Sequence, residues 1–214
     1  MSEARMGLRE RKKQLTYQAV SEAAISMFLE RGFDKVSVAE VAAAADISKP
    51  TLFRYFPAKE DLVLHRFADH EDEAARVVSG RADGLSPLDA LRHHFLDGLE
   101  RRDPVTGLCD NPHVLAFHRL LYGTPSLVAR LYAYQGRSEA ALARALDPGI
   151  PVAARLAAGQ IVAVLRILAE ENWRRIDAGE SADQVHADAE AAAGLAFAQL
   201  ADGLVTTDPA EAPR

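Results

Sequence analysis

Disulfide pairs, membrane-spanning runs and β-strand patterns are all missing from this sequence. Its single cysteine, Cys109, cannot form an internal disulfide, which fits a reducing cytoplasm. No uninterrupted apolar run approaches the roughly 18 residues that a membrane-spanning helix needs. The charged N-terminus lacks the apolar segment of a secretory signal, and no period-2 pattern is long enough to predict a strand. We therefore expect a cytoplasmic protein that has no membrane partner.

Sequence motifs of catalysis and cofactor binding are missing as well. The chain has no GxGxxG, Walker or GxSxG motif. Its seven histidines lack the HxxxH spacing that places two metal ligands on one helical face. Cys109 has no cysteine partner for a CxxC motif, although a redox role for its thiol remains open. We predict no catalytic residue, no metal site and no cofactor, and hence a protein that is not an enzyme.

Helical periodicity, by contrast, runs through the whole chain. Hydrophobic residues make up 49% of it, alanine is abundant, and apolar side chains recur three and four positions apart. Gly32, Pro57 and the run Pro148-Gly149-Ile150-Pro151 mark breaks between helices. The predicted fold class is all-α, with helices at about residues 10–31, 37–45, 49–56, 59–82, 86–101, 112–122, 125–146, 152–178 and 181–203.

Residues 36–62 carry the strongest functional signal, which is a pair of short helices separated by about one turn. Ser37 and Glu40 form a capping box at the start of the first helix. Ser48 is placed to cap the second, and Pro50 lies in its first turn, where no backbone donor is needed. The second helix is polar and basic on one side. This arrangement predicts a helix-turn-helix whose second helix contacts DNA.

Five side chains in this segment are the candidate DNA contacts. Lys49 can donate to guanine, and Thr51 can offer its hydroxyl or its methyl group to a base edge. Tyr55 and Lys59 are placed to bind phosphates, which fixes register without reading sequence. Ser37, at a free helix N-terminus, can hold another phosphate. We therefore predict a pair of base-reading residues and a group of three phosphate-binding residues.

The charge distribution agrees with a protein that touches DNA with one end. Residues 1–60 carry 10 basic and 8 acidic side chains, whereas the other 154 residues carry 15 and 23. The net charge of −6 argues against non-specific coating of nucleic acid. Basic side chains are densest in residues 1–13. This segment is either an arm that reaches phosphates or a minor groove, or a solvated tail.

Residues 10–65 resemble the N-terminal domain of TetR-family transcriptional regulators. The resemblance rests on the first helix ending at Gly32-Phe33, on Ile47-Ser48, and on the run TLFRYFPAKEDL. In that family the positions that match Ser37, Thr51, Tyr55 and Lys59 commonly contact DNA. Two positions depart from the family pattern: Phe53 stands where tyrosine is frequent, and Ala58 where a helix-capping side chain is frequent.

The resemblance implies that residues 85–206 form a helical bundle with a ligand pocket and a dimer interface. Residues 155–204 further resemble a subgroup whose C-terminal domains bind acyl-CoA-like ligands, which makes a fatty acyl or acyl-CoA effector the hypothesis. Dimerisation also follows from the residues, because the last two helices are apolar on more than one face. The alternative is a single-chain bundle that buries both faces. A symmetric dimer would bind a palindromic double-stranded DNA operator.

The candidate ligand pocket is apolar and contains one uncharged polar side chain. Asn172 lies late in a long apolar helix, and we expect it to be buried with a hydrogen-bond partner. Each of the apolar candidates could equally be an ordinary core residue. The candidate ligand-binding residues are Phe95, Leu99, Phe117, Leu121, Tyr122, Leu165, Leu168, Asn172 and Trp173.

We predict a DNA-binding domain at residues 1–57, a ligand-binding and dimerisation domain at 58–206, and a disordered tail at 207–214. The predicted function is a ligand-responsive repressor, a homodimer that a small apolar or acyl-type effector releases from its operator. Two alternatives stay open. One is a DNA-binding activator or architectural protein without an effector, and the other is a helical-bundle enzyme that keeps a DNA-binding head as a relic.

Overall fold

The computed structural model describes the backbone of residues 8–202 and the side chains of residues 14–66 and 70–202. The regular elements of the described residues are all helices, with no strand among them, which confirms the predicted all-α class. The tail predicted at residues 207–214 and the first seven residues of the predicted basic arm lie outside the described residues. The chain is divided into two compact units, and each unit contains segments that are far apart in the sequence.

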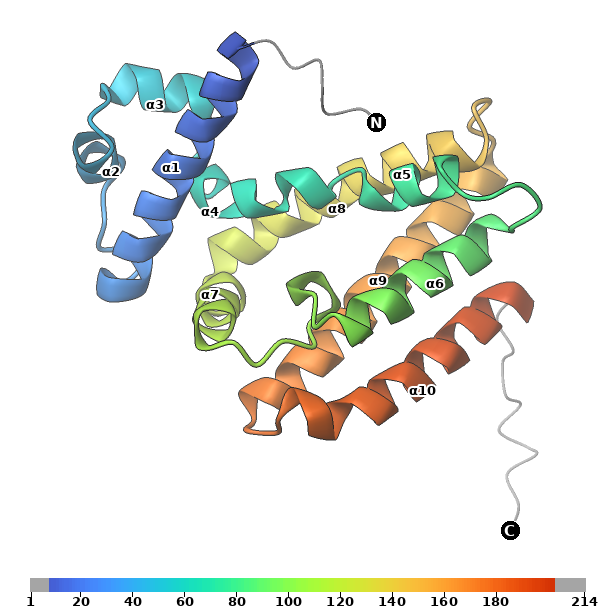
Figure 1. Ribbon diagram of the computed structural model, residues 1–214. Helices are drawn as coiled ribbons and strands as arrows, with labels where there is room; N and C mark the ends of the chain where they lie inside the picture. Colours follow the sequence, from blue (N-terminus) through green and yellow to red (C-terminus); the bar gives the residue numbers. More distant parts are fainter. Residues whose placement is uncertain (1–7, 203–214) are drawn as a thin grey trace. The chain divides into compact units, whose positions relative to one another are not determined.

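The first unit combines the N-terminal helices with a segment from the middle of the chain. It contains residues up to 71 together with residues 115–135. Its elements are α1 (Leu8–Arg31), α2 (Val38–Ala44), α3 (Lys49–Tyr55), α4 (Asp61–Leu64), the 3₁₀ helix η2 (His65–His70), most of α7 (Pro112–Gly123) and the first half of α8 (Pro125–Leu146) (Figure 1). The three N-terminal helices have the order and lengths of a helix-turn-helix domain.

One apolar core holds this unit together. It is built from side chains of α1 to α4 and extends to α7 and α8. Its fully buried members include Val20, Phe28, Val41, Leu52, Phe56, Leu62, Leu121 and Leu127. Because Leu52 and Phe56 lie four apart on and just after α3, their burial turns the opposite side of that helix toward solvent. Both side chains are therefore core residues.

The prediction of one continuous helix at residues 59–82 is wrong. The structure has α4 with four residues, then η2 with six, and after a turn α5 (Glu73–Ser79). Between Leu64 and Val77 the sequence has one large apolar residue, Phe67. A helix of that length depends on packing an apolar face, and this stretch offers too little of one to hold a continuous helix.

The second unit is a layer of helices formed by residues 72–114 and those from 136 onward. It contains α5, α6 (Pro87–Glu100), the 3₁₀ helix η3 (Pro104–Thr106), the second half of α8, α9 (Val152–Asp177) and α10 (Ala182–Asp202). Helix α10 packs against both α6 and α9 (Figure 1). Ser86 and Ser181 cap α6 and α10, and Ser181 forms a capping box with Gln184.

Helix α9 is the described helix that is long and apolar enough to cross a membrane by length and composition alone. Its most apolar 18-residue window has a mean hydropathy of 1.7. The sequence expectation missed it because Arg155 and Arg166 interrupt the apolar run. One such helix is weak evidence for a membrane span, and α9 packs against α10 and η3 within its own unit.

A buried histidine predicts how the stability of the first unit depends on pH. His118 on α7 is 7% exposed, and burial, with a contribution from Arg66, lowers its pKa from 6.5 to about 4. The folded state therefore favours the neutral ring. We expect the free energy of unfolding to fall by about 1–3 kcal/mol as the pH drops from about 6.5 to about 4, because the unfolded chain binds the proton first.

Urea denaturation of wild type and His118→Leu between pH 7 and pH 4 measures this term. The variant should lose less stability than wild type over that range. The exposed His93→Leu serves as the matched control and should keep the wild-type profile. Parallel profiles for wild type and His118→Leu would contradict the assignment.

Candidate nucleic-acid interface

The N-terminus of α2 is fixed by the capping box that the sequence predicts. Ser37 Oγ accepts the Glu40 backbone N–H at 3.2 Å, and a Glu40 carboxylate oxygen accepts the Ser37 N–H at 2.8 Å. The other Glu40 oxygen pairs with Arg31 at 2.6 Å. These bonds, with the Ser37 N–H first, lower the pKa of Glu40 to about 2. The exposed Ser37 hydroxyl keeps its own hydrogen for an outside acceptor, as a phosphate contact needs.

The N-terminus of α3 carries the two residues predicted to read bases. Lys49 is exposed, and its ammonium lies 5.9 Å from the centroid of the Phe53 ring. Thr51 is half-buried, and its hydroxyl lies 2.8 Å from the hydroxyl of Ser48, whose side chain also caps the helix. The Thr51 hydroxyl is therefore shared with the cap, which leaves its methyl group as the freer recognition element.

Tyr55 lies at the end of α3 between two neighbours. Its ring centroid is 4.8 Å from that of Tyr17 on α1, and the Arg54 guanidinium lies 5.4 Å from the same ring. The half-buried ring is thus held by packing, which restricts where its hydroxyl can point. Phe53 is 40% exposed on the same helix and has no polar atom to offer to a phosphate.

Lys59 has a structural contact that the sequence did not predict. Its ammonium donates to the Phe33 carbonyl at 2.5 Å and lies 4.2 Å from the centroid of the Phe33 ring. The bond joins the segment after α3 to the end of α1. Lysine carries three N–H donors, so Lys59 can keep this bond and still bind a phosphate. No local spacing signals the contact, because its partner is 26 residues away.

An ion pair on the other side of the same turn was also missed. Arg130 on α8 donates to Asp61 through Nε at 2.8 Å and through Nη2 at 3.0 Å. The second Asp61 oxygen also accepts the Ala58 N–H at 2.9 Å. This bond replaces part of the helix cap that alanine cannot supply at position 58. The hydrogen bonds of Lys59 and Asp61 together fix the position of the turn that follows α3.

The candidate ligand-binding residues are divided between the two units. Phe117, Leu121 and Tyr122 lie on α7 and join or pack against the core of the first unit. The others, Phe95, Leu99, Leu165, Leu168, Asn172 and Trp173, lie on α6 and α9 in the second unit. Their role as a pocket stays a prediction.

Asn172 is buried with a partner, as the sequence predicted. It is 5% exposed, and its amide donates to the Thr106 carbonyl at 2.9 Å. Gly107, the next residue, has a positive φ of 73°, and a Cβ there would lie 1.9 Å from the Ala169 carbonyl oxygen. The η3 segment therefore lies directly against α9, and Asn172 anchors it there.

A groove of about 450 Å³ lies between the second half of α8 and the start of α9. Two arginines, one glutamate and several apolar side chains line it, among them Glu139, Ala143, Arg144, Ile150, Arg155 and Leu156. None of the candidate ligand-binding residues lines it. The groove could not be predicted from the sequence, because the irregular 147–151 connection brings its two walls together.

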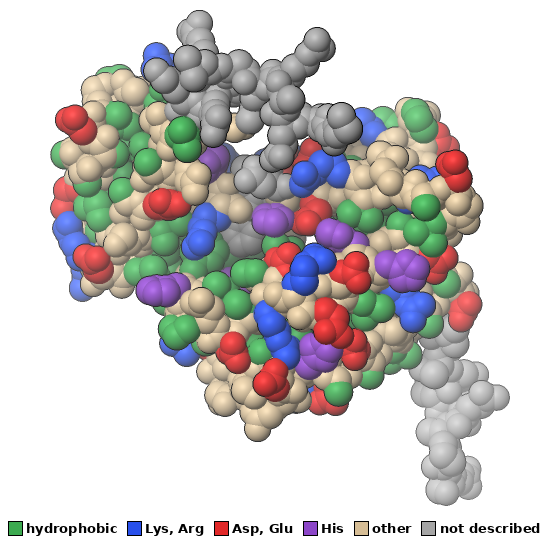
Figure 2. Space-filling view, in the orientation of Figure 1, with side chains coloured by type: hydrophobic (Ala, Val, Ile, Leu, Met, Phe, Trp, Pro, Cys, Tyr) green, Lys and Arg blue, Asp and Glu red, His purple; other side chains and the backbone are tan. Residues whose placement is uncertain are grey.

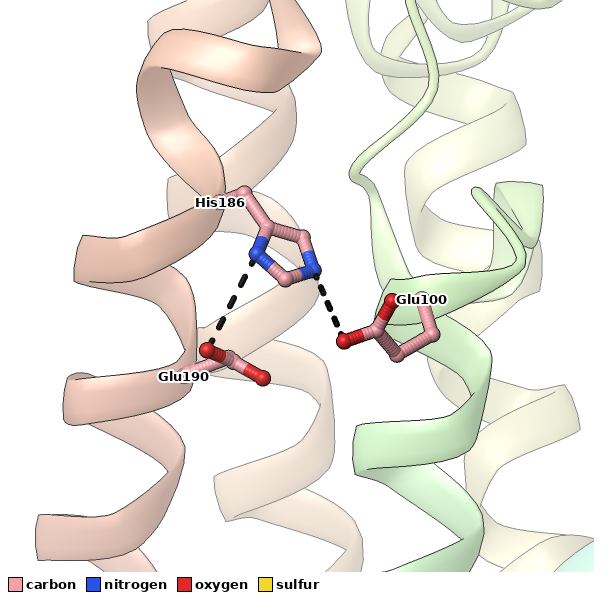
Figure 3. Close-up of side chains that lie close together, drawn as sticks. All are labelled: Glu100, His186 and Glu190. Atoms are coloured by element: carbon pink, nitrogen blue, oxygen red, sulfur yellow. Dashed lines mark ion pairs between the residues drawn. The ribbon is translucent and has the colours of Figure 1, made fainter.

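The surface over α6 and α10 mixes acidic, basic and histidine side chains (Figure 2). Within it, His186 lies between two carboxylates, 3.9 Å from Glu100 and 3.8 Å from Glu190 (Figure 3). His186 and Glu190 are four apart on α10, an HxxxE spacing that a search for HxxxH overlooks. Two ligands of one tetrahedral zinc ion lie about 3.4 Å apart. The two nitrogens face different carboxylates at longer distances, so we assign the cluster to the packing of α10 on α6.

Comparison with known proteins agrees with this architecture. Residues 21–65 match the family model for bacterial regulatory proteins of the tetR family. The HTH-type transcriptional regulator TcmR of Streptomyces glaucescens is 30% identical over 139 residues, which are 64% of this chain and 62% of TcmR. This chain thus aligns with less than two thirds of the length of TcmR.

Solved structures show the same fold at low sequence identity. The crystal structure of a TetR-family regulator from Streptomyces coelicolor aligns with a TM-score of 0.54 at 20% identity, over 91% of this chain and 98% of that one. The SmeT–triclosan complex aligns with a TM-score of 0.54 at 13% identity, over 94% and 98%.

Residues 21–65 thus match the tetR family model, and the chain is similar to regulators of that family. Its relatives are named as transcriptional regulators, in agreement with the expectation that it is not an enzyme.

The Asn172 anchor leads to a stability prediction. Asn172→Ala removes the donor to a buried carbonyl and should lower the free energy of unfolding by about 1–3 kcal/mol in chemical denaturation. The exposed Gln160→Ala on the same helix is the matched control and should stay within about 0.5 kcal/mol of wild type. Equal stabilities of the two variants would show that the anchor contributes nothing.

Proposed function

We propose that this protein is a cytoplasmic, ligand-responsive repressor that binds a palindromic DNA operator as a homodimer. The observation that carries the proposal is the presentation of α3. Leu52 and Phe56 are buried beneath it, while Lys49 is exposed at its first residue. A recognition helix needs this geometry, because base edges in the major groove are reached from the N-terminal part of the helix.

The proposed contacts divide by chemistry. Lys49 and the Thr51 methyl group would read base edges, whereas Ser37, Tyr55 and Lys59 would hold phosphates. The packing of Tyr55 and the cap at Ser37 support this division, because a phosphate contact is useful only if the side chain is fixed in position. The match of residues 21–65 to the tetR family model supports DNA contact by this segment, because all five candidate residues lie inside the matched range.

A homodimer is proposed from the surface of α9 and α10. Val152, Leu156 and Ile167 on α9 and Leu195 on α10 are between 55% and 68% exposed. Large apolar side chains exposed on two adjacent helices favour burial against a second copy. Two-fold symmetry would place the two recognition helices about 34–36 Å apart, on successive turns of the DNA.

Release by a small-molecule effector is proposed from the size of the second unit and from related proteins. SmeT, which shares this fold, has been solved as a complex with triclosan. We extend this to an apolar or acyl-type effector for this chain, with fatty acyl and acyl-CoA ligands as the first class to test. Binding would favour a dimer geometry in which the two recognition helices no longer fit one operator.

Selection of bound sequences from random DNA tests the DNA-binding proposal and yields an operator. We expect a palindrome whose half-sites are one helical turn apart. On that operator, Tyr55→Phe and Lys59→Ala should weaken binding about equally on all sequences, because phosphate contacts carry no base information. Lys49→Ala should cost about 1–3 kcal/mol and also relax preference at one base pair.

The exposed Arg92→Ala on α6 is the matched control and should bind as wild type does. Since Lys59 also bonds the Phe33 carbonyl, its variant requires a parallel unfolding measurement at the binding temperature. A single unpaired half-site would argue against a symmetric dimer, and unchanged base preference in Lys49→Ala would remove its reading role.

Titration of the protein–operator complex with long-chain acyl-CoA and with free fatty acid tests the effector class. We expect one of them to release the operator and to raise the melting temperature of the free protein, because a ligand that binds the folded state stabilises it. Coenzyme A without an acyl chain is the matched control. If none of these compounds binds or releases the operator, the acyl class is excluded.

A further inference from the structure

We infer that Arg130 is a positioning residue for DNA binding: its paired hydrogen bonds to Asp61 hold the turn between the recognition helix and α4 at the orientation that the operator requires. The inference rests on the proposed function and adds a residue to it. Arg130 lies 69 positions beyond Asp61 and far outside the helix-turn-helix in sequence.

Arg130 and Asp61 form a bidentate ion pair. Nε and Nη2 of Arg130 meet separate Asp61 oxygens at 2.8 and 3.0 Å, an arrangement that fixes both distance and direction. The Asp61 side chain is 20% exposed and the Arg130 side chain 39%. The hydrogen bonds and charge of Asp61 raise the pKa of Arg130 above its ordinary value. A lysine could supply the charge but not both bonds.

Asp61 also binds the backbone of the turn, so the position that Arg130 gives to Asp61 restrains that backbone. The oxygen that receives Arg130 Nη2 also accepts the Ala58 N–H at 2.9 Å. Pro57 ends the segment that begins with α3. Ala58 lies between Pro57 and Lys59. From the opposite side, Lys59 bonds the Phe33 carbonyl. The backbone at residues 57–61 is therefore held at two points, and α3 ends directly before it.

Arg130 projects from a helix that is itself fixed. Leu127, Leu131 and Tyr134 on the same part of α8 are buried in the core of the first unit, with at most 7% exposed. Beyond residue 135 the same helix belongs to the second unit. A displacement of α8 would therefore act on the turn through the Arg130–Asp61 pair. The turn takes its position from a helix that both units share.

The test compares Arg130→Gln, Asp61→Asn, the double variant and Arg130→Lys on the selected operator. Asparagine at 61 keeps an oxygen for the Ala58 N–H and removes the charge that binds arginine. We expect each single variant to lose about three- to ten-fold in affinity and the double variant to lose no more than the worse single one. Arg130→Lys should recover part of the loss. Arg144→Gln, an exposed arginine on the same helix, should bind as wild type does.

Salt dependence separates positioning from direct contact. If Arg130 positions the turn, the slope of log affinity against log salt stays at its wild-type value in Arg130→Gln. If the magnitude of this slope is smaller by about one in Arg130→Gln, Arg130 itself binds a phosphate, and the inference is overturned. Additive losses in the double variant would overturn it as well, because they would show that the two residues act separately.

Hydrogen exchange of the free protein provides a readout that does not depend on DNA. In Arg130→Gln the amides of Ala58 and Leu62 should exchange faster, while those in the middle of α1 stay as in wild type. Unchanged exchange at the turn would overturn the positioning role even if the operator is bound. Wild-type protein that selects no DNA sequence would instead overturn the proposed function itself.

Discussion

The turn that follows α3 depends on the hydrogen bonds of the Asp61 carboxylate. This carboxylate accepts two hydrogen bonds from Arg130 and one from the Ala58 backbone, so one side chain joins a distant helix to the end of the recognition segment. Pro57 and Ala58 can supply neither a capping side chain nor, in the case of proline, a backbone donor. Asp61 and Lys59 thus fix the turn that follows α3, while the burial of Leu52 and Phe56 sets which side of α3 faces solvent.

Much of the helix-turn-helix could be predicted from the sequence, because its signals are local. The capping box at Ser37 and the cap at Ser48 involve partners three residues away and are present as expected. The bonds that fix the turn could not be predicted, since Lys59 reaches back 26 residues and Arg130 reaches back 69. Spacing along one helix indicates which face is buried, but not which distant side chain will meet a polar group on it.

The second unit shows the same limit in another form. Helical periodicity correctly placed α8 at residues 125–146 and identified Asn172 as buried. It could not show that the partner of Asn172 is a carbonyl of η3, because that short element has no periodicity to detect. The same limit applies to the candidate ligand-binding residues. Their apolar spacing predicts burial, and the structure distributes them over two units.

The six-residue 3₁₀ helix at His65–His70 lies in the first unit, directly before the boundary with the second unit at residues 71 and 72. Runs of this helix type longer than three or four residues are uncommon. A 3₁₀ helix rises about 2.0 Å per residue and an α-helix about 1.5 Å. An α-helix of the same six residues would be about 3 Å shorter. The 3₁₀ form thus lets these six residues span more distance than the same residues would as α-helix.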